Sequence, residues 1–246
     1  MIVGIMQPYF FPYLGYFQLM KYVDIWVILD RVQFMYPGWI NRNRILHPDV
    51  RKEWNFITIP LSKRGQFDRI CDISIADRKD WRTRLFNKLF VYREAPYYEE
   101  TSVFVEKCLA CPEEKLSAFL KETLASTARK LNITTQILQQ GDLEIDPSSV
   151  EPGQWALRIA RELRASAYVN PPGGIEIYEE ANFAASGIDL RFLKPALNAY
   201  PQQREKFVPA LSIIDVLMWN NFEEVERMLS KDYTVLTKEQ LCKDDA

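Results

Sequence analysis

Short, uninterrupted apolar runs mark the beginning of the chain. Residues 2–6 and 25–29 are such runs, and they are typical of strands that are buried on both faces of a parallel sheet. Residues 14–23 between them have the character of a helix. The opening therefore predicts a β-α-β unit with a right-handed crossover, and residues 54–60 predict a further strand.

The pattern further along the chain predicts more helices and a second β-α-β unit. Apolar residues recur at helical spacing over 79–93 and 112–131. A strand over 133–138, a helix over 154–163 and a strand over 167–169 are expected to follow. This repeated order of elements favours an α/β protein.

The C-terminal part is expected to be helical. Residues 208–218 are apolar and fit a helix, and Asn221 with Glu224 three residues later fits the capping box of another. Residues 238–246 read as a polar tail that frays. We therefore expect one α/β domain over 1–237, with a Rossmann-like parallel-sheet core, flanking helices and a helical C-terminal part.

Composition and charge narrow the choice of partners and compartment. The chain has 246 residues, of which 48% are hydrophobic and 26% charged, as in ordinary globular proteins. Its formal net charge of −2 gives no basic field for nucleic acid, so no nucleic-acid partner is expected. No apolar run reaches the ~18 residues that span a bilayer, and no signal peptide is evident. We expect a soluble, cytoplasmic protein without a transmembrane segment.

The residues that are missing exclude several kinds of chemistry. His47 is the one histidine, which rules out sites with several histidine ligands. Cys108 and Cys111 have the spacing of half a zinc site, but no second pair follows, so no metal site is expected. The common glycine-rich phosphate-binding patterns are also absent.

Two stretches rich in aromatic and polar residues directly follow the first two expected strands, where ligands bind in open α/β sheets. Asp30, at a strand end, is a candidate acid, base or magnesium ligand. Arg42 and Arg44 can clamp phosphate or carboxylate, and Trp39 offers a stacking face. A rigid aromatic turn and a solvated ion-pair loop are the structural alternatives. The candidate substrate-binding residues here are Gln7, Tyr9, Gln33, Trp39, Asn41, Arg42, Asn43 and Arg44.

Two later stretches supply further candidates. Paired glycines after the strand at 167–169 allow a close approach of backbone to ligand, with Glu176 nearby as a catalytic candidate, although an ordinary turn also explains them. Asp215 interrupts an apolar run, so this second catalytic candidate is either functional or paired inside the core. The substrate-binding candidates in these stretches are Gly173, Gly174, Tyr178, Gln202 and Ser212.

These distant stretches are expected to meet, because parallel strands carry their following loops to one edge of the sheet. We also expect Asp215 to pair with a backbone N–H or an arginine, since an unpaired buried carboxylate costs several kcal/mol. The residues expected to line one pocket are Gln7, Asn41, Arg42, Gly174, Glu176 and Asp215.

Four segments in the same order resemble the WbqC-like protein family, found among genes for bacterial O-antigen and other surface polysaccharides. They are MQPYFFPYLGYF from Met6, WINRNRI from Trp39, GGIEIY from Gly173 and LSIIDVLMWN from Leu211. The resemblance extends from Ile2 to about Tyr233 and implies a role in adding glycine or another acyl group to a sugar.

The first thirty residues also resemble the opening of the HIGH-type nucleotidyltransferases and pantothenate synthetases, which bind ATP where two motif histidines lie. Tyr13 and Tyr16 occupy those positions here. Tyrosine is not a cationic phosphate ligand near neutral pH, because its reference pKa is about 10. This resemblance therefore implies the fold and not the adenylyl-transfer activity.

The leading hypothesis is a cytosolic enzyme that transfers an aminoacyl or acyl group to a nucleotide-linked amino sugar and forms an amide. Arg42 and Arg44 would hold the pyrophosphate, Trp39 or Tyr9 would stack on base or sugar, and Asp30 would be the general base. Hydroxyl groups of the substrate would be bound by Gln7, Asn41 and Asn43.

Two alternatives stay open at this point. One is a nucleotidyl-transferring or adenylate-forming enzyme that uses ATP and magnesium, with Asp30 or Asp215 as a metal ligand. The other is a non-catalytic scaffold or sugar-nucleotide-binding protein that works with other biosynthetic enzymes. Outside the ATP reading, no cofactor is implied.

Overall fold

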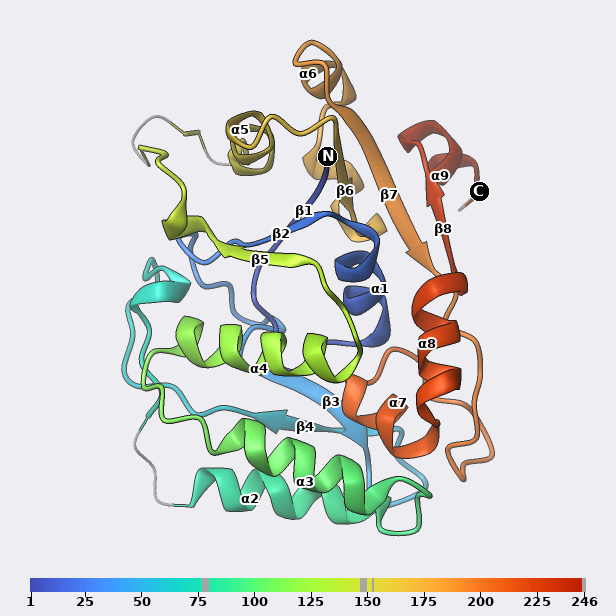
Figure 1. Cartoon of the computed structure of the whole chain (residues 1–246). Coiled ribbons are helices and arrows are strands. Elements are labelled where there is room, and N and C mark those ends of the chain that lie inside the picture. The colour runs from blue at the N-terminus through green and yellow to red at the C-terminus, as the bar shows by residue number, and fades with distance from the viewer. Residues whose placement is uncertain (77–79, 147–149, 152, 245–246) are drawn as a thin grey trace.

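The structure is a computed structural model that describes residues 1–76, 80–146, 150–151 and 153–244. A six-stranded sheet forms its centre, in the order β5-β2-β1-β6-β7-β8 (Figure 1). All neighbouring strands are parallel except β7 and β8, which are antiparallel. The strands are β1 (Ile2–Met6), β2 (Ile25–Ile28), β5 (Gln136–Gln139), β6 (Ala167–Asn170), β7 (Asp189–Pro195) and β8 (Tyr233–Leu236).

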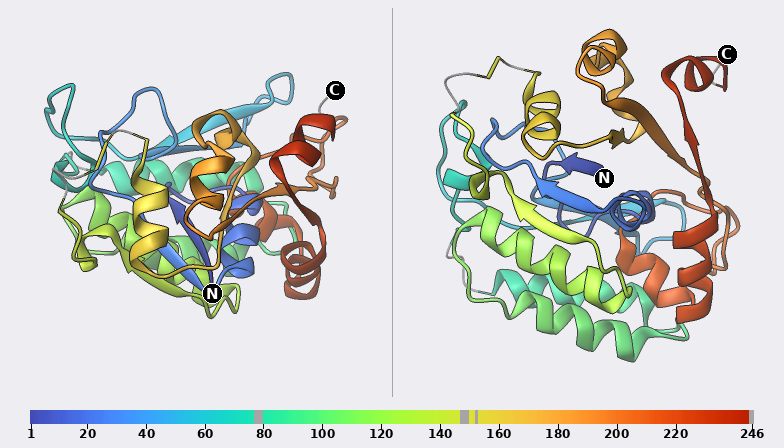
Figure 2. Two further views of the ribbon diagram at one scale, coloured as in Figure 1. Left: turned by 90° about the horizontal axis from the view of Figure 1, so that it is seen from above. Right: turned by 45° about the horizontal axis from the view of Figure 1, so that its top comes forward.

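Helices cover both faces of this sheet, which confirms the expected Rossmann-like α/β fold. Successive side chains of a strand point to opposite faces of the sheet. Val3 and Ile5 of β1 lie in the buried cluster on one face, and Trp26 and Ile28 of β2 lie in the buried cluster on the other. Figures 1 and 2 show α4 on one side of the sheet and α5, α6 and α9 on the other. The first side is covered by α1 (Leu14–Tyr22), α4 (Leu116–Lys130) and α8 (Phe222–Lys231), and the second by α5 (Trp155–Glu162), α6 (Glu180–Ala184) and α9 (Lys238–Asp244).

A second layer is packed against α4. Helix α3 contacts α2, α4 and α7, and α7 contacts strand β3 of a separate antiparallel hairpin. In the described part of the chain, no helix is both long and apolar enough to cross a membrane. The elements of this layer are the hairpin β3 (Arg42–Leu46) and β4 (Trp54–Thr58), α2 (Trp81–Asn87), the 3-10 helix η2 (Lys88–Tyr92), α3 (Tyr98–Leu109) and α7 (Ile213–Trp219).

Short 3-10 turns complete the elements that the site uses. They are η1 (Ile70–Asp72), η3 (Gln140–Asp142) and η5 (Pro172–Ile177). The first lies beside α4, the second directly follows β5, and the third directly follows β6.

The opening β-α-β unit is confirmed, as are both strands and the helix of the second. The capping box is also confirmed, since the Asn221 side chain accepts from Glu224 N and the Glu224 side chain from Asn221 N. The expected helix over 79–93 is helical from Trp81 to Tyr92, and residue 79 lies outside the described residues.

Besides the start of β5, which lies at Gln136 rather than at residue 133, three expectations were wrong. The expected strand over 54–60 exists as β4 but pairs with β3 instead of joining the main sheet. Helix α4 begins at Leu116 rather than at 112, because Lys115 is extended and pairs with Ser74 in an isolated antiparallel bridge. Helix α7 begins at Ile213 rather than at residue 208, and Ser212 caps its start.

Two segments that were expected to be irregular are regular. The WINRNRI segment was interpreted as a loop, but its second half is β3. Residues 238–244 of the expected polar tail form α9, because Leu241 is buried in the cluster on the α5 side of the sheet. Residues 245 and 246 lie outside the described residues.

Candidate functional site

The order of strands identifies where a ligand is expected. From β1 the chain builds one side of the sheet through β2 and β5, and the other side through β6 and β7. The direction of winding therefore changes between β1 and β6, and ligands of open α/β sheets bind at the carboxyl ends of strands at such a point. The turns after Met6 and after Asn170 start at this position.

The turn after β1 has an unusual backbone that two distant side chains hold. Phe11 is left-handed, with φ of 40°, which is unfavourable for a residue with a large side chain. The Asn43 side-chain amide donates to the carbonyl oxygens of Phe10 (3.1 Å) and Phe11 (2.9 Å). The Ser212 hydroxyl donates to the same Phe11 oxygen (2.8 Å). Asn43 and Ser212 thus stabilise the turn.

Backbone hydrogen bonds connect the same three segments. The N–H of Ser212 donates to the carbonyl of Arg44 (2.8 Å), and the N–H of Ile213 donates to that of Pro12 (2.9 Å). The N–H of Phe10 donates to the carbonyl of Trp39. The first motif, the hairpin and the start of α7 are therefore fixed relative to one another.

A cavity of about 200 Å³ opens beside this turn. Its wall is largely aromatic, and it brings together residues from the first two motifs and one from just before α7. Aromatic faces of this kind stack on planar or sugar-like ligands. The lining residues are Tyr9, Pro12, Tyr13, Trp39, Asn43, Arg44 and Ala210.

Arg44 supplies the positive charge of this cavity. Its guanidinium group lies 5.1 Å from the ring centre of Trp39 and 5.5 Å from that of Trp54. Nη2 donates to the carbonyl of Ala210 (3.1 Å), whereas the buried Nε has no hydrogen-bond partner. Burial lowers the pKa of Arg44, so the cation is partly desolvated and has a donor to spare for an anion.

Tyrosines link the cavity to the third motif. Burial raises the pKa of Tyr9, and the nearby Tyr178 hydroxyl adds to this effect, so the two side chains are close. Tyr178 in turn hydrogen-bonds to Tyr168 (3.0 Å). A Cβ at Gly174 would lie 2.0 Å from the side-chain nitrogen of Asn170, so packing requires a glycine here.

Asp30 lies at the neighbouring strand end. The N–H of Leu29 donates to the carbonyl of Met6, which places the residues after β1 and β2 next to each other. The carboxylate is buried, and its Oδ2 accepts hydrogen bonds from Ser117 Oγ (2.5 Å) and Gln139 Nε2 (3.2 Å). Among the described residues no donor reaches its Oδ1, which is also buried. One oxygen thus holds the carboxylate in place, and the other makes no hydrogen bond there.

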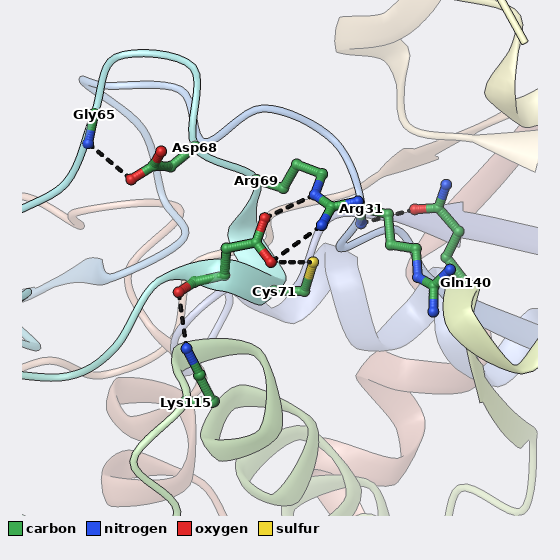
Figure 3. A network of polar contacts seen from close by, with 8 residues as sticks. Arg31, Gly65, Asp68, Arg69, Cys71, Lys115 and Gln140 are labelled. Atoms are coloured by element: carbon green, nitrogen blue, oxygen red, sulfur yellow. Dashed lines mark hydrogen bonds and ion pairs between the residues drawn. The ribbon is translucent and has the colours of Figure 1, made fainter. Parts of the chain in front are cut away.

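Polar contacts tie together the segments next to Asp30, and Figure 3 shows those of Arg69 and Arg31 among them. The N–H of Cys71 donates to the backbone oxygen of Asp30 (2.9 Å). Arg69 pairs with Asp72 (2.7 Å), and its pKa is raised chiefly by this contact and slightly by Asp30. The Arg31 N–H donates to Gln140 Oε1 (2.8 Å). The segments after β2 and β5, η1 and the start of α4 are thereby tied together around the carboxylate.

Asp215 is fully buried in a separate network. Its Oδ2 accepts from the Tyr200 hydroxyl (2.6 Å) and from Gln202 Nε2 (2.7 Å), and the Tyr92 hydroxyl also lies near the carboxylate. The expectation of a backbone or arginine partner was wrong, because a tyrosine and an amide from the preceding loop fill that role. Desolvation raises the pKa of Asp215 to about 6, although the hydrogen bonds partly oppose this.

The expectation of a single pocket was wrong, because none of the six residues named for it lines the cavity beside Tyr9. Asn41 instead donates to the carbonyl of Ile59, and Arg42 donates to that of Gly38 and stacks on Phe56. Their neighbours Asn43 and Arg44 reach the cavity. The remaining candidates are dispersed: Gln7 is half-buried at the end of β1, Gln33 donates to the carbonyl of Gln66, and Gly173 and Glu176 are exposed on η5.

The sequence alone did not identify several residues that shape the candidate site. Ser117 and Gln139 orient Asp30, and a signal for Gln139 existed, because it ends a strand at the same sheet edge as Asp30. Of the two HIGH-type positions, Tyr13 lines the cavity, whereas Tyr16 is buried and donates to the carbonyl of Gln7. Within the described ranges, no group of three or more His, Cys, Asp or Glu side chains is arranged to hold a metal ion.

Comparison with known proteins gives a family match that includes the motifs that meet at this site. The model of the WbqC-like protein family matches residues 7–227, from the turn after β1 into α8. The chain belongs to the WbqC-like protein family. It is 27% identical over 218 residues to "Uncharacterized protein Rv1507c" of Mycobacterium tuberculosis, a match that covers 87% of this chain and 92% of that WbqC-like relative. No solved structure matches the chain significantly.

The raised pKa of Asp215 predicts a specific dependence of stability on pH. Between about pH 4 and pH 6 the folded state holds a proton that the unfolded state has lost, so stability falls as the pH rises through this window. The loss is up to about 3 kcal/mol, at 1.36 kcal/mol for each unit of pKa. Urea unfolding from pH 3.5 to 7 should show this slope in the wild type and in the control Asp244→Asn, but not in Asp215→Asn. An equal slope in all three proteins would contradict the assignment.

Proposed function

We propose that this chain is a transferase of bacterial surface-polysaccharide biosynthesis that acts on a nucleotide-linked amino sugar and forms an amide by aminoacyl (glycine) or acyl transfer. The observation that carries the proposal is the partly desolvated Arg44 among aromatic faces, beside the switch point of the sheet. Membership of the WbqC-like family supports the polysaccharide context.

The cavity has the parts that a sugar nucleotide requires. The rings of Tyr9 and Trp39 offer faces for a base or a sugar, and the guanidinium of Arg44 offers a planar, charged donor for a diphosphate. A volume of about 200 Å³ holds only part of such a molecule. In this proposal the rest of the substrate extends over the adjacent strand ends, in the direction of Gln7 and Asp30.

Amide formation also requires a base. An amino sugar is an ammonium ion at neutral pH, and its nitrogen attacks an acyl carbonyl carbon only after a proton has left. We assign this proton to Oδ1 of Asp30, which has no hydrogen-bond partner, while Ser117 and Gln139 hold Oδ2. The leaving group of the acyl donor departs as the C–N bond forms.

Binding of the sugar nucleotide tests the first part of the proposal. UDP-glucosamine should raise the melting temperature without magnesium, and Arg44→Gln should weaken its binding roughly 10- to 100-fold, the range for loss of a charged hydrogen bond. The measurement is calorimetric titration. Arg51→Gln is the matched control, because Arg51 is exposed and remote from the cavity lining. Stabilisation by ATP with magnesium, and none by UDP-glucosamine or UDP, would refute the proposal.

Replacement of Asp30 tests the second part. Asp30→Asn keeps the shape of the side chain but removes the base, so turnover of UDP-glucosamine with an activated glycine donor should fall 10²- to 10⁴-fold. The affinity measured by calorimetry should stay within a few fold of the wild type. Asp244→Asn, on exposed α9, serves as the control. Unchanged turnover in Asp30→Asn would remove Asp30 from the mechanism.

A further inference from the structure

A second cavity, of about 360 Å³, lies on the other half of the β3–β4 hairpin. Ile45 and Leu46 of β3, residues of η2 and the loop over 202–204 form its wall. It shares no lining residue with the cavity beside Tyr9. Nothing in the proposed function uses it.

The charge of this second cavity is positive although the whole chain is slightly negative. Lys88, Arg93 and Arg204 line it against a single carboxylate, Glu94. Glu94 pairs with Arg93 at 3.3 Å, so the positive charges of Lys88 and Arg204 have no carboxylate partner within the lining. Lys88 donates to the carbonyl of Phe56 (2.6 Å), and burial lowers its pKa.

Two buried nitrogen donors among the lining residues have no acceptor within the part of the chain that the structure describes. Arg204 is held by a hydrogen bond from Nη2 to the carbonyl of His47, while its buried Nη1 has no hydrogen-bond partner. Trp219 is 8% exposed, its ring packs edge-on against Tyr92, and its Nε1 is also unpartnered. A buried donor without an acceptor costs free energy, which an incoming anion can recover.

We propose that this cavity binds a small organic anion, a carboxylate or phosphate on an apolar body. The anionic group is bound by Arg204, with Trp219 as a second donor and Lys88 as a further positive charge. The apolar body lies against Leu46, Val50 and Phe90, of which Val50 and Phe90 are exposed at the rim. A neutral apolar ligand would leave the nitrogen donors unpaired, so the anion is required.

The test is titration of the full chain, labelled with ¹⁵N at the tryptophan indoles, with hexanoate. The resonance that is lost in Trp219→Phe identifies the Trp219 N–H, and this variant keeps the ring against Tyr92. Hexanoate should shift this resonance saturably. Hexanol, which has the same apolar body without the charge, should not shift it at concentrations that saturate hexanoate. Inorganic phosphate should bind more weakly than hexanoate.

Substitutions test whether hexanoate binding, measured by the shift of the Trp219 resonance, depends on the proposed donors. Arg204→Gln should weaken hexanoate binding at least tenfold, whereas Arg158→Gln, on α5 on the other side of the sheet, should leave it unchanged. Arg93 is half-exposed, so Arg93→Gln should fold whatever the fate of Arg204→Gln, and it should weaken binding by a smaller, salt-dependent factor. The proposal is overturned if hexanoate gives no saturable shift, if hexanol acts equally well, or if neither arginine variant changes the affinity.

Discussion

The carbonyl oxygen of Phe11 is the point on which the arrangement of the candidate site depends. Asn43 from β3 and Ser212 from the start of α7 both donate to it, and they hold the chain in a left-handed conformation that costs about 1–3 kcal/mol on its own. Together with the backbone hydrogen bond from Phe10 N–H to the carbonyl of Trp39, this clamp keeps Tyr9 beside Trp39 and Arg44 in the wall of one cavity. The strain at the end of β1 is thus offset by contacts that also bring the hairpin and α7 to the sheet.

Strand β3 connects the two cavities through this clamp. Its first half contributes Asn43 and Arg44 to the cavity beside Tyr9, and its second half contributes Ile45 and Leu46 to the cavity beside Arg204. The same strand is fixed at Asn43 by the turn and at Leu46, whose N–H donates to the Tyr92 hydroxyl. A ligand in either cavity therefore lies against one rigid strand.

The sequence predicted the parallel core because β1 and β2 are buried on both faces, which leaves an uninterrupted apolar run. It did not predict β3, because the inward-facing residue Asn43 is polar and interrupts the alternation of apolar and polar residues. The Asn43 side-chain amide donates hydrogen bonds to backbone carbonyl groups instead. Asp30 could be expected at a strand end, but its partner Ser117 comes from a distant helix. The motifs supply most of the residues that line the candidate cavity. Which member of each motif faces the cavity depends on tertiary contacts that periodicity does not encode.

A thermodynamic double-mutant cycle of Asn43→Ala and Ser212→Ala tests the clamp most directly. Urea unfolding would give the free energy of unfolding of the wild type, both single variants and the double variant. Because both side chains hold one oxygen, the account predicts that the effects are not additive, with a coupling energy of about 1–2 kcal/mol. Additivity within about 0.5 kcal/mol would show that the two contacts are independent and would contradict the account.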